Sequence, residues 1–246
     1  MVEHLAYPPH VRLFRCQPRE IGVYLPIPLS GRLDALVEIA KDAWAPVMRK
    51  EVMSALLLDA KAEDRWLRLV LSRYRKARVS DAFVSGWSED FFLWPPDDRG
   101  PRPLRLWGDD GEAFPPEDSP PVHRDEALAA AADYRIGMPV PSPLAGRLDL
   151  LLRIAAEGGA ATTRKDLLAA LILDAPIHGA KLAAKLRKYW HATVADAVIA
   201  GQPTEPIFEW PHERTRPVRR AARYIDRGSP AEPPPVRPLG RRVPTP

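Results

Sequence analysis

The chain repeats itself at an offset of 115 residues. Residues 21–84 align with residues 136–199 without a gap, and 27 of these 64 positions are identical. The phrase PLSGRLDAL at 28–36, for example, returns as PLAGRLDLL at 143–151. Chance similarity does not hold one register over so many residues while apolar positions stay apolar. The repeat therefore indicates a fold built from two similar units, and repeats must be recognised before any other pattern is interpreted.

The repeat divides the 246 residues into five segments. We expect an N-terminal arm at 1–18, a first unit at 19–84, a linker at 85–133, a second unit at 134–200 and a tail at 201–246. The linker holds 12 acidic residues, 4 arginines and 8 prolines, whereas residues 212–246 hold 9 arginines, 3 acidic residues and 8 prolines. Such compositions bury little apolar surface, so we expect the linker and the tail to be mostly extended or disordered.

The composition also argues against several classes of protein. The sequence has no run of 18 or more apolar residues, the length that a membrane-spanning helix needs. Its start, MVEHLAYPPHVRLFRC, lacks the apolar stretch of a secretory signal. Cys16 is the only cysteine, which excludes an internal disulfide and metal sites built on cysteine pairs. We expect a cytoplasmic protein that does not contact a membrane, and its richness in alanine, arginine and proline resembles the proteins of GC-rich bacteria.

Each unit opens with a short alternating segment. The apolar positions are Ile21, Val23 and Leu25 in the first copy and Ile136, Met138 and Val140 in the second. A period of two predicts a strand with one apolar face. The residues on the opposite face are Glu20, Gly22, Tyr24, Arg135, Gly137 and Pro139. A strand this short is not stable alone and needs a partner.

Three helices are predicted to follow each strand. Their apolar faces in the first copy comprise Leu29, Leu33, Leu36 and Ala40; Val52, Met53, Leu56 and Leu57; and Leu67, Leu71 and Tyr74. In the second copy Gly158 and Gly159 end the first helix, and Thr163 with Asp166 forms a capping box for the next. The outer face of the third helix is basic in both copies, which we interpret as a solvated surface. Arg32 and Asp34 cannot face each other on one helix, so we expect each to pair with another element.

The order strand, helix, turn, helix, with the pattern I-x-V-x-L-P-x-x-L-x-x-R-L-D, resembles the ribbon-helix-helix family, the Arc/MetJ/CopG-like DNA-binding proteins. The matching residues are Ile21, Val23, Leu25, Pro26, Leu29, Arg32, Leu33 and Asp34, and Ile136, Val140, Pro141, Leu144, Arg147, Leu148 and Asp149. The resemblance covers roughly 40 residues of each unit. It implies a mainly α fold with a short two-stranded antiparallel ribbon, in which the two units, each with an extra helix, form a pseudo-dimer. Pairing of the strands between chains, and a further homodimer, both stay open.

The resemblance implies double-stranded DNA as the partner. On the outward strand face it assigns Tyr24 and Arg135 to base contacts. At the start of the second helix of each unit it assigns a set of phosphate-binding residues: Arg49, Lys50, Thr163, Arg164 and Lys165. Cations at a helix N-terminus oppose the helix dipole, which suggests that an anion binds there. The alternative interpretation of these cations is a solvated charged turn.

No pattern in the sequence favours an enzyme. The six histidines do not recur between the copies, and we find no catalytic residue, metal site or cofactor motif. Asp109, Asp110 and Glu112 lie in the proline-rich linker, where we interpret them as solvated acids. The sequence favours a DNA-binding protein, a transcriptional regulator or a plasmid, conjugation or partition accessory protein, that relies mainly on phosphate contacts. The alternative is a protein-interaction module on a degenerate ribbon-helix-helix fold, with an Arg/Pro tail that binds a protein partner.

Overall fold

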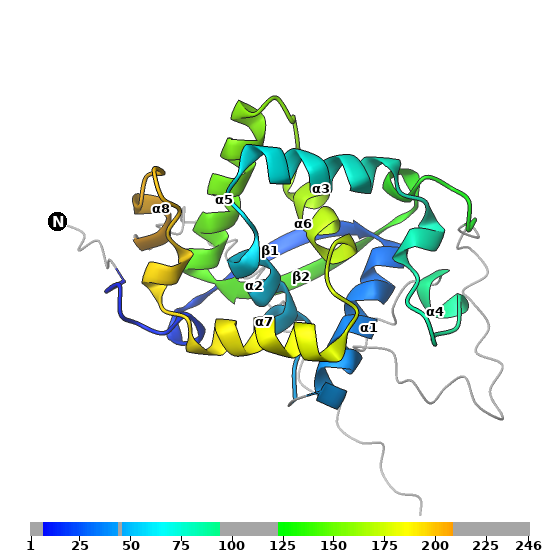
Figure 1. Ribbon diagram of the computed structural model, residues 1–246, viewed down its shortest axis with the longest axis horizontal. Coiled ribbons are helices and arrows are strands. Elements are labelled where there is room, and N and C mark those ends of the chain that lie inside the picture. Colours follow the sequence, from blue (N-terminus) through cyan, green and yellow to red (C-terminus); the bar gives the residue numbers. More distant parts are fainter. Residues whose placement is uncertain (1–6, 44–45, 94–122, 209–246) are drawn as a thin grey trace, which may run out of the picture. The chain divides into compact units, whose positions relative to one another are not determined.

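The two alternating segments pair with each other. In the computed structural model, which describes residues 7–43, 46–93 and 123–208, strands β1 (Pro18–Pro26) and β2 (Asp133–Pro141) form a two-stranded antiparallel ribbon (Figure 1). Gly22 lies opposite Gly137, Tyr24 opposite Arg135, and Glu20 opposite Pro139. Gly22 and Gly137 are 115 residues apart, so residues that correspond in the repeat lie symmetrically about this central glycine pair.

The predicted alternation is confirmed in both strands. Ile21, Val23, Leu25, Ile136, Met138 and Val140 are all buried in the core, whereas the residues between them are exposed or half-buried. The ribbon therefore has one covered and one open face. Pro139 lacks an N–H for the strand ladder, but both strands of a two-stranded ribbon are edges, where proline is tolerated.

The rest of the described fold is mainly helical. The α-helices are α1 (Ile27–Ala43), α2 (Arg49–Asp59), α3 (Asp64–Lys76), α4 (Asp90–Leu93), α5 (Ser142–Glu157), α6 (Arg164–Leu173), α7 (Gly179–His191) and α8 (Glu205–Phe208). Short 3-10 helices span Leu13–Arg15, Val79–Ala82, Leu128–Ala130 and Val194–Ala197. A mainly helical protein with a two-stranded antiparallel ribbon is thus confirmed. None of the helices in the described ranges is both long and apolar enough to cross a membrane.

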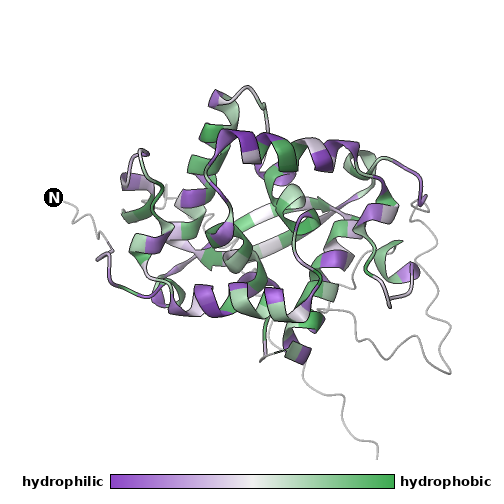
Figure 2. Cartoon of the chain, viewed as in Figure 1, coloured by the Kyte–Doolittle hydropathy of each residue, from purple (hydrophilic) through white to green (hydrophobic). Residues whose placement is uncertain are grey.

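The helices cover one face of the ribbon. In Figure 1 the ribbon lies behind α2 and α6, with α3 and α7 on either side of them, and α2 packs against β2 while α6 packs against β1. Along α3 and α7, hydrophilic and hydrophobic residues alternate as in amphipathic helices (Figure 2). Tyr74 and Tyr189 on these two helices are buried, and burial raises the pKa of each to about 12.

The helix boundaries follow local signals in the second copy. The Thr163 hydroxyl accepts a hydrogen bond from the Asp166 amide at 3.2 Å, and the Asp166 carboxylate accepts one from the Thr163 amide at 3.2 Å. This confirms the predicted capping box. After α5, Gly159 adopts a φ of 81°, which a residue with a side chain rarely does. Helix α2 begins differently, because Met48 offers no capping hydroxyl and its amide donates to the Glu51 carboxylate at 2.8 Å.

The glycine of the repeated phrase allows a close backbone contact in each copy. Helix α4 packs on α1, and helix α8 packs on α5. A Cβ atom at Gly31 would lie 2.8 Å from the Phe91 carbonyl oxygen, and one at Gly146 would lie 1.8 Å from the Pro206 carbonyl oxygen. The repeated glycine is therefore a packing requirement that leaves no room for a side chain.

The described fold extends beyond the two sequence units. Residues 85–93 and 123–133, which we expected in the linker, contribute helix α4 and the start of β2, and residues 201–208, which we expected in the extended tail, contribute helix α8. The segment before each strand binds the segment after the third helix of the other copy: the Leu13 amide donates to the Ala192 carbonyl at 3.0 Å, and the Leu128 amide donates to the Ala77 carbonyl at 2.9 Å. The remainder of the expected linker (94–122), the tail from 209 and residues 1–6 lie outside the described residues.

Candidate nucleic-acid interface

The open face of the ribbon is flat at its centre and chemically different at its two ends. Gly22 and Gly137 place no side chain at the centre. Beyond them lie Tyr24, which is 56% exposed, and Arg135 at one end, and Glu20 and Pro139 at the other. The Glu20 carboxylate lies beside Gly137, because a Cβ atom at Gly137 would be 2.7 Å from its Oε1, whereas a Cβ atom at Gly22 would meet nothing within 4 Å. The two predicted base-contacting residues, Tyr24 and Arg135, are thus cross-strand neighbours on an exposed surface.

The predicted phosphate-binding residues lie at the starts of two equivalent helices. Arg49 and Lys50 are the first two residues of α2, Arg164 and Lys165 are the first two of α6, and Thr163 is the N-cap of α6. Since α2 packs against β2 and α6 against β1, the four cations belong to the two helices that pack on the covered face of the ribbon.

Both arginines of this set already bind a carboxylate. Arg49 donates to Asp34 on α1, with an Nη2–Oδ2 distance of 2.6 Å, and Asp34 is only 3% exposed. Arg164 donates to Asp149 on α5, with Nη2–Oδ1 and Nε–Oδ1 distances of 2.6 and 3.0 Å. The anion that balances a cation at these helix starts therefore comes from the chain itself, and it tethers α2 to α1 and α6 to α5.

The two lysines differ from each other. Lys165 lies 2.6 Å from Asp133 at the start of β2. Lys50 lies 3.7 Å from Glu51, whose carboxylate also accepts the Met48 amide, and the Lys50 side chain is 41% exposed. The difference has a simple cause, because the residue that corresponds to Asp133 in the first copy is Pro18, which has no charge to offer.

Two buried arginines, Arg32 and Arg147, occupy the same place in the repeated phrase and hold the helices of the two copies together. Arg32 on α1 donates to the carbonyls of Ile172 and Leu173 at the end of α6, both at 3.0 Å, and to that of Ala82 at 3.2 Å. Burial lowers the pKa of Arg32, and the nearby Asp174 partly opposes this. The guanidinium thus satisfies carbonyls at a helix C-terminus, where a cation is favourable.

Arg147 makes the corresponding contacts in the opposite direction. It donates to the Leu57 carbonyl at 3.1 Å and the Ala60 carbonyl at 2.8 Å at the end of α2, and to the Ala197 carbonyl of the 3-10 helix Val194–Ala197 at 2.9 Å. Each copy therefore caps the second helix of the other. The expectation that the arginine and the aspartate of the repeated phrase bind other elements is confirmed. The two copies also share the aspartates Asp34 and Asp149 and the arginines Arg49 and Arg164. This shared pair of residue types is the sequence signal for the ion pairs between Asp34 and Arg49 and between Asp149 and Arg164.

Three cations on the third helices, Arg73, Lys185 and Lys188, form ion pairs with the other copy. Arg73 lies 3.0 Å from Asp174, and Lys188 lies 2.9 Å from Asp59. Burial would raise the pKa of Asp59, but hydrogen bonds from Lys185 and Lys188 outweigh it and lower the pKa. These charges lie on the helical side of the fold and act mainly between its own elements.

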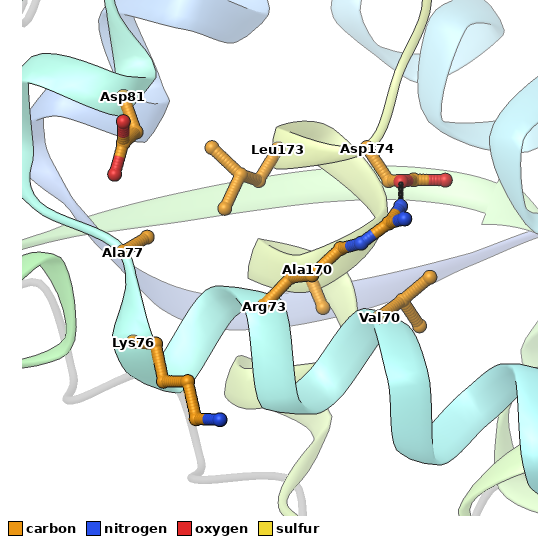
Figure 3. A pocket seen from close by; sticks show the side chains of 8 residues that line it. All are labelled: Val70, Arg73, Lys76, Ala77, Asp81, Ala170, Leu173 and Asp174. Carbon is orange, nitrogen blue, oxygen red and sulfur yellow. Dashed lines mark hydrogen bonds and ion pairs between the residues drawn. The ribbon is translucent and has the colours of Figure 1, made fainter.

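A hollow of about 440 Å³ lies between α3 and α6 (Figure 3). Arg73, Lys76, Asp81 and Asp174 contribute two charges of each sign to its wall, and the ion pair between Arg73 and Asp174 crosses one side of it. This balance does not select a charged ligand. Within the described ranges no three His, Cys, Asp or Glu side chains gather as a metal site requires, and Asp109, Asp110 and Glu112 lie outside those ranges.

Comparison with known proteins yielded no match: no family model, no curated protein and no solved structure is similar to this chain.

Proposed function

We propose that the chain binds double-stranded DNA as a fused ribbon-helix-helix pseudo-dimer, with the open face of its ribbon in the major groove. The observation that carries the proposal is the paired ribbon with one face covered by helices and the other open. A two-stranded β-ribbon fits the major groove, which is about 12 Å wide. Gly22 at the centre of the ribbon leaves its backbone open, since a Cβ atom there would meet nothing within 4 Å, and this supports a close approach to the base edges.

The proposal assigns phosphate contacts to the starts of α2 and α6. Exposed backbone amides and the positive end of the dipole favour an anion at such helix starts. Of the four cations, Lys50 is the most readily free to bind a phosphate. Its acidic neighbour Glu51 is 3.7 Å away and also accepts a hydrogen bond from the Met48 amide. Arg49 is 22% exposed and Arg164 is 48% exposed, so Arg164 can more readily share its carboxylate partner with a phosphate.

The second candidate function is a protein-interaction module that keeps the ribbon without reading DNA. The observation that favours it is the acidic partner beside each of the four cations: Asp34, Glu51, Asp149 and Asp133. In that case the open ribbon face or the Arg/Pro tail binds a protein partner. Either function is that of a binding protein, and we propose no catalytic activity.

A pair of charge-removing variants of the full-length chain tests the DNA proposal. Lys50→Gln removes a cation at the start of α2, whereas Arg187→Gln removes an exposed cation from α7, which packs against α1 and α2. We expect Lys50→Gln to weaken binding to a labelled duplex and to reduce the slope of log K against log salt by about 0.9, the value for one phosphate contact. Arg187→Gln should change neither. Equal effects of the two variants would argue for non-specific attraction, and absence of binding by the unaltered chain would favour the protein-interaction module.

A further inference from the structure

The ribbon places residues of opposite charge at symmetric positions on its open face. Glu20 and Arg135 are 115 residues apart and correspond in the repeat. On one side of the central glycine pair, Glu20 lies opposite Pro139. On the other side, Arg135 lies opposite Tyr24. Rotation about the Gly22–Gly137 centre therefore exchanges a carboxylate for a guanidinium. The remaining exchanged pair, Tyr24 and Pro139, also differs in its hydrogen-bonding capacity.

A palindromic duplex presents the same base to both members of such a pair. An arginine binds guanine through its two major-groove acceptors, O6 and N7. The same guanine at the symmetric position would direct those acceptors at the Glu20 carboxylate, which has no proton to donate when ionised. A carboxylate instead accepts a hydrogen bond from the N4 amino group of cytosine. Glu20 and Arg135 thus prefer complementary bases at positions where a palindrome supplies identical ones.

We propose that the DNA target is non-palindromic, with guanine facing Arg135 and cytosine facing Glu20 at the symmetry-related position. This inference rests on the proposed DNA-binding function and goes beyond it by assigning the symmetry of the target. The central glycines contribute no side chain, so discrimination lies in the base pairs on either side of the centre. One good base contact corresponds to roughly 5- to 150-fold in affinity. A palindromic version of the site should therefore bind more weakly by a factor in this range.

Selection from a random duplex library with the full-length chain tests the inference. The bound duplexes are sequenced, and the symmetry of the enriched motif is determined for the unaltered protein, for Glu20→Arg and for Arg135→Glu. Both residues are exposed, so neither substitution disturbs the core. Glu20→Arg places arginine at both symmetric positions and should make the motif symmetric at the base pairs that these residues face, with guanine on both sides. Arg135→Glu places glutamate at both positions and should make the motif symmetric at the same base pairs, with cytosine on both sides.

The possible results separate the inference from the proposed function. A palindromic motif for the unaltered chain, or a motif whose symmetry neither variant changes, overturns the inference while DNA binding stands. Strong binding without any enriched motif also overturns it, because the ribbon then reads no bases. If the chain binds no duplex even at low salt, the proposed function itself fails. A non-palindromic motif that becomes symmetric in both variants at the base pairs facing residues 20 and 135 supports the inference.

Discussion

Replacement of Arg32 by methionine should cost the fold about 3–5 kcal/mol, because several charge-assisted hydrogen bonds to buried backbone carbonyls are lost together. Arg32 is 7% exposed, and three of its hydrogen bonds to carbonyls are 3.2 Å or shorter. A hydrogen bond to a charged group contributes about 1.5–3 kcal/mol. Relief of the buried guanidinium's desolvation offsets part of the loss. Methionine keeps most of the apolar volume, so the effect reports the lost hydrogen bonds at the end of α6.

Equilibrium unfolding in urea measures this loss. With a slope of about 2–3 kcal/mol per molar urea, the unfolding midpoint should fall by about 1–2.5 M. Arg147→Met should have a similar effect, because its contacts at the end of α2 correspond to those of Arg32. Arg19→Met is the control, since Arg19 is 41% exposed and lies 3.9 Å from Asp149. The control should lose less than about 1 kcal/mol, as exposed ion pairs do.

A loss below about 1 kcal/mol for both Arg32→Met and Arg147→Met would refute the reasoning, because that is the range of an exposed ion pair. It would mean that the ends of α2 and α6 do not depend on the other copy. A large loss for one variant and none for the other would show that the two halves are not held together equivalently.

Three further predictions concern packing, pH and charge. Gly146→Ala should destabilise the fold by about 1–3 kcal/mol or more, since the new methyl group would overlap the backbone of α8. Urea unfolding measures this loss, and an unchanged unfolding midpoint would contradict the close contact. Burial raises the pKa of Tyr74 and Tyr189 to about 12, so the stability they confer is fully present below the ordinary tyrosine pKa of about 10 and should be lost as the pH rises toward 12. Phenolate absorbance followed together with unfolding checks this, and full ionisation of both tyrosines near pH 10 in the folded protein would disprove it. Asp133→Asn should release Lys165 and tighten duplex binding at low salt, and the slope of log K against log salt should become steeper by up to about 0.9. Anisotropy titration measures the affinity and the slope, and weaker binding would count against a phosphate contact by Lys165.

Local patterns in the sequence predicted much of the fold. The alternation at Ile21, Val23 and Leu25 predicted a strand with one buried face, and Thr163 with Asp166 predicted the capping box at the start of α6. These predictions succeed because period and capping depend on a few adjacent residues. The helices α4 and α8 were not predicted, because four-residue helices carry almost no periodic signal and depend on a tertiary contact at Gly31 or Gly146.

The candidate site was only partly predictable. The sequence correctly placed Tyr24 and Arg135 on the exposed strand face, but their pairing depends on a register set between segments more than 100 residues apart. The carbonyls of Ile172 and Leu173 that Arg32 binds lie about 140 residues further along the chain, and no local rule selects them. The geometry of the ion pair between Asp34 and Arg49 likewise depends on tertiary structure, because it is set by how α1 and α2 pack.

The most direct test of the central proposal is the salt dependence of duplex binding by the full-length chain. Fluorescence anisotropy of a labelled random-sequence duplex is measured at several salt concentrations. If the ribbon and the starts of α2 and α6 bind DNA, log K should fall linearly with log salt, with a slope of about −0.9 for each phosphate contacted. A duplex that stays unbound at the lowest salt would contradict the proposal and direct the search to a protein partner of the open ribbon face.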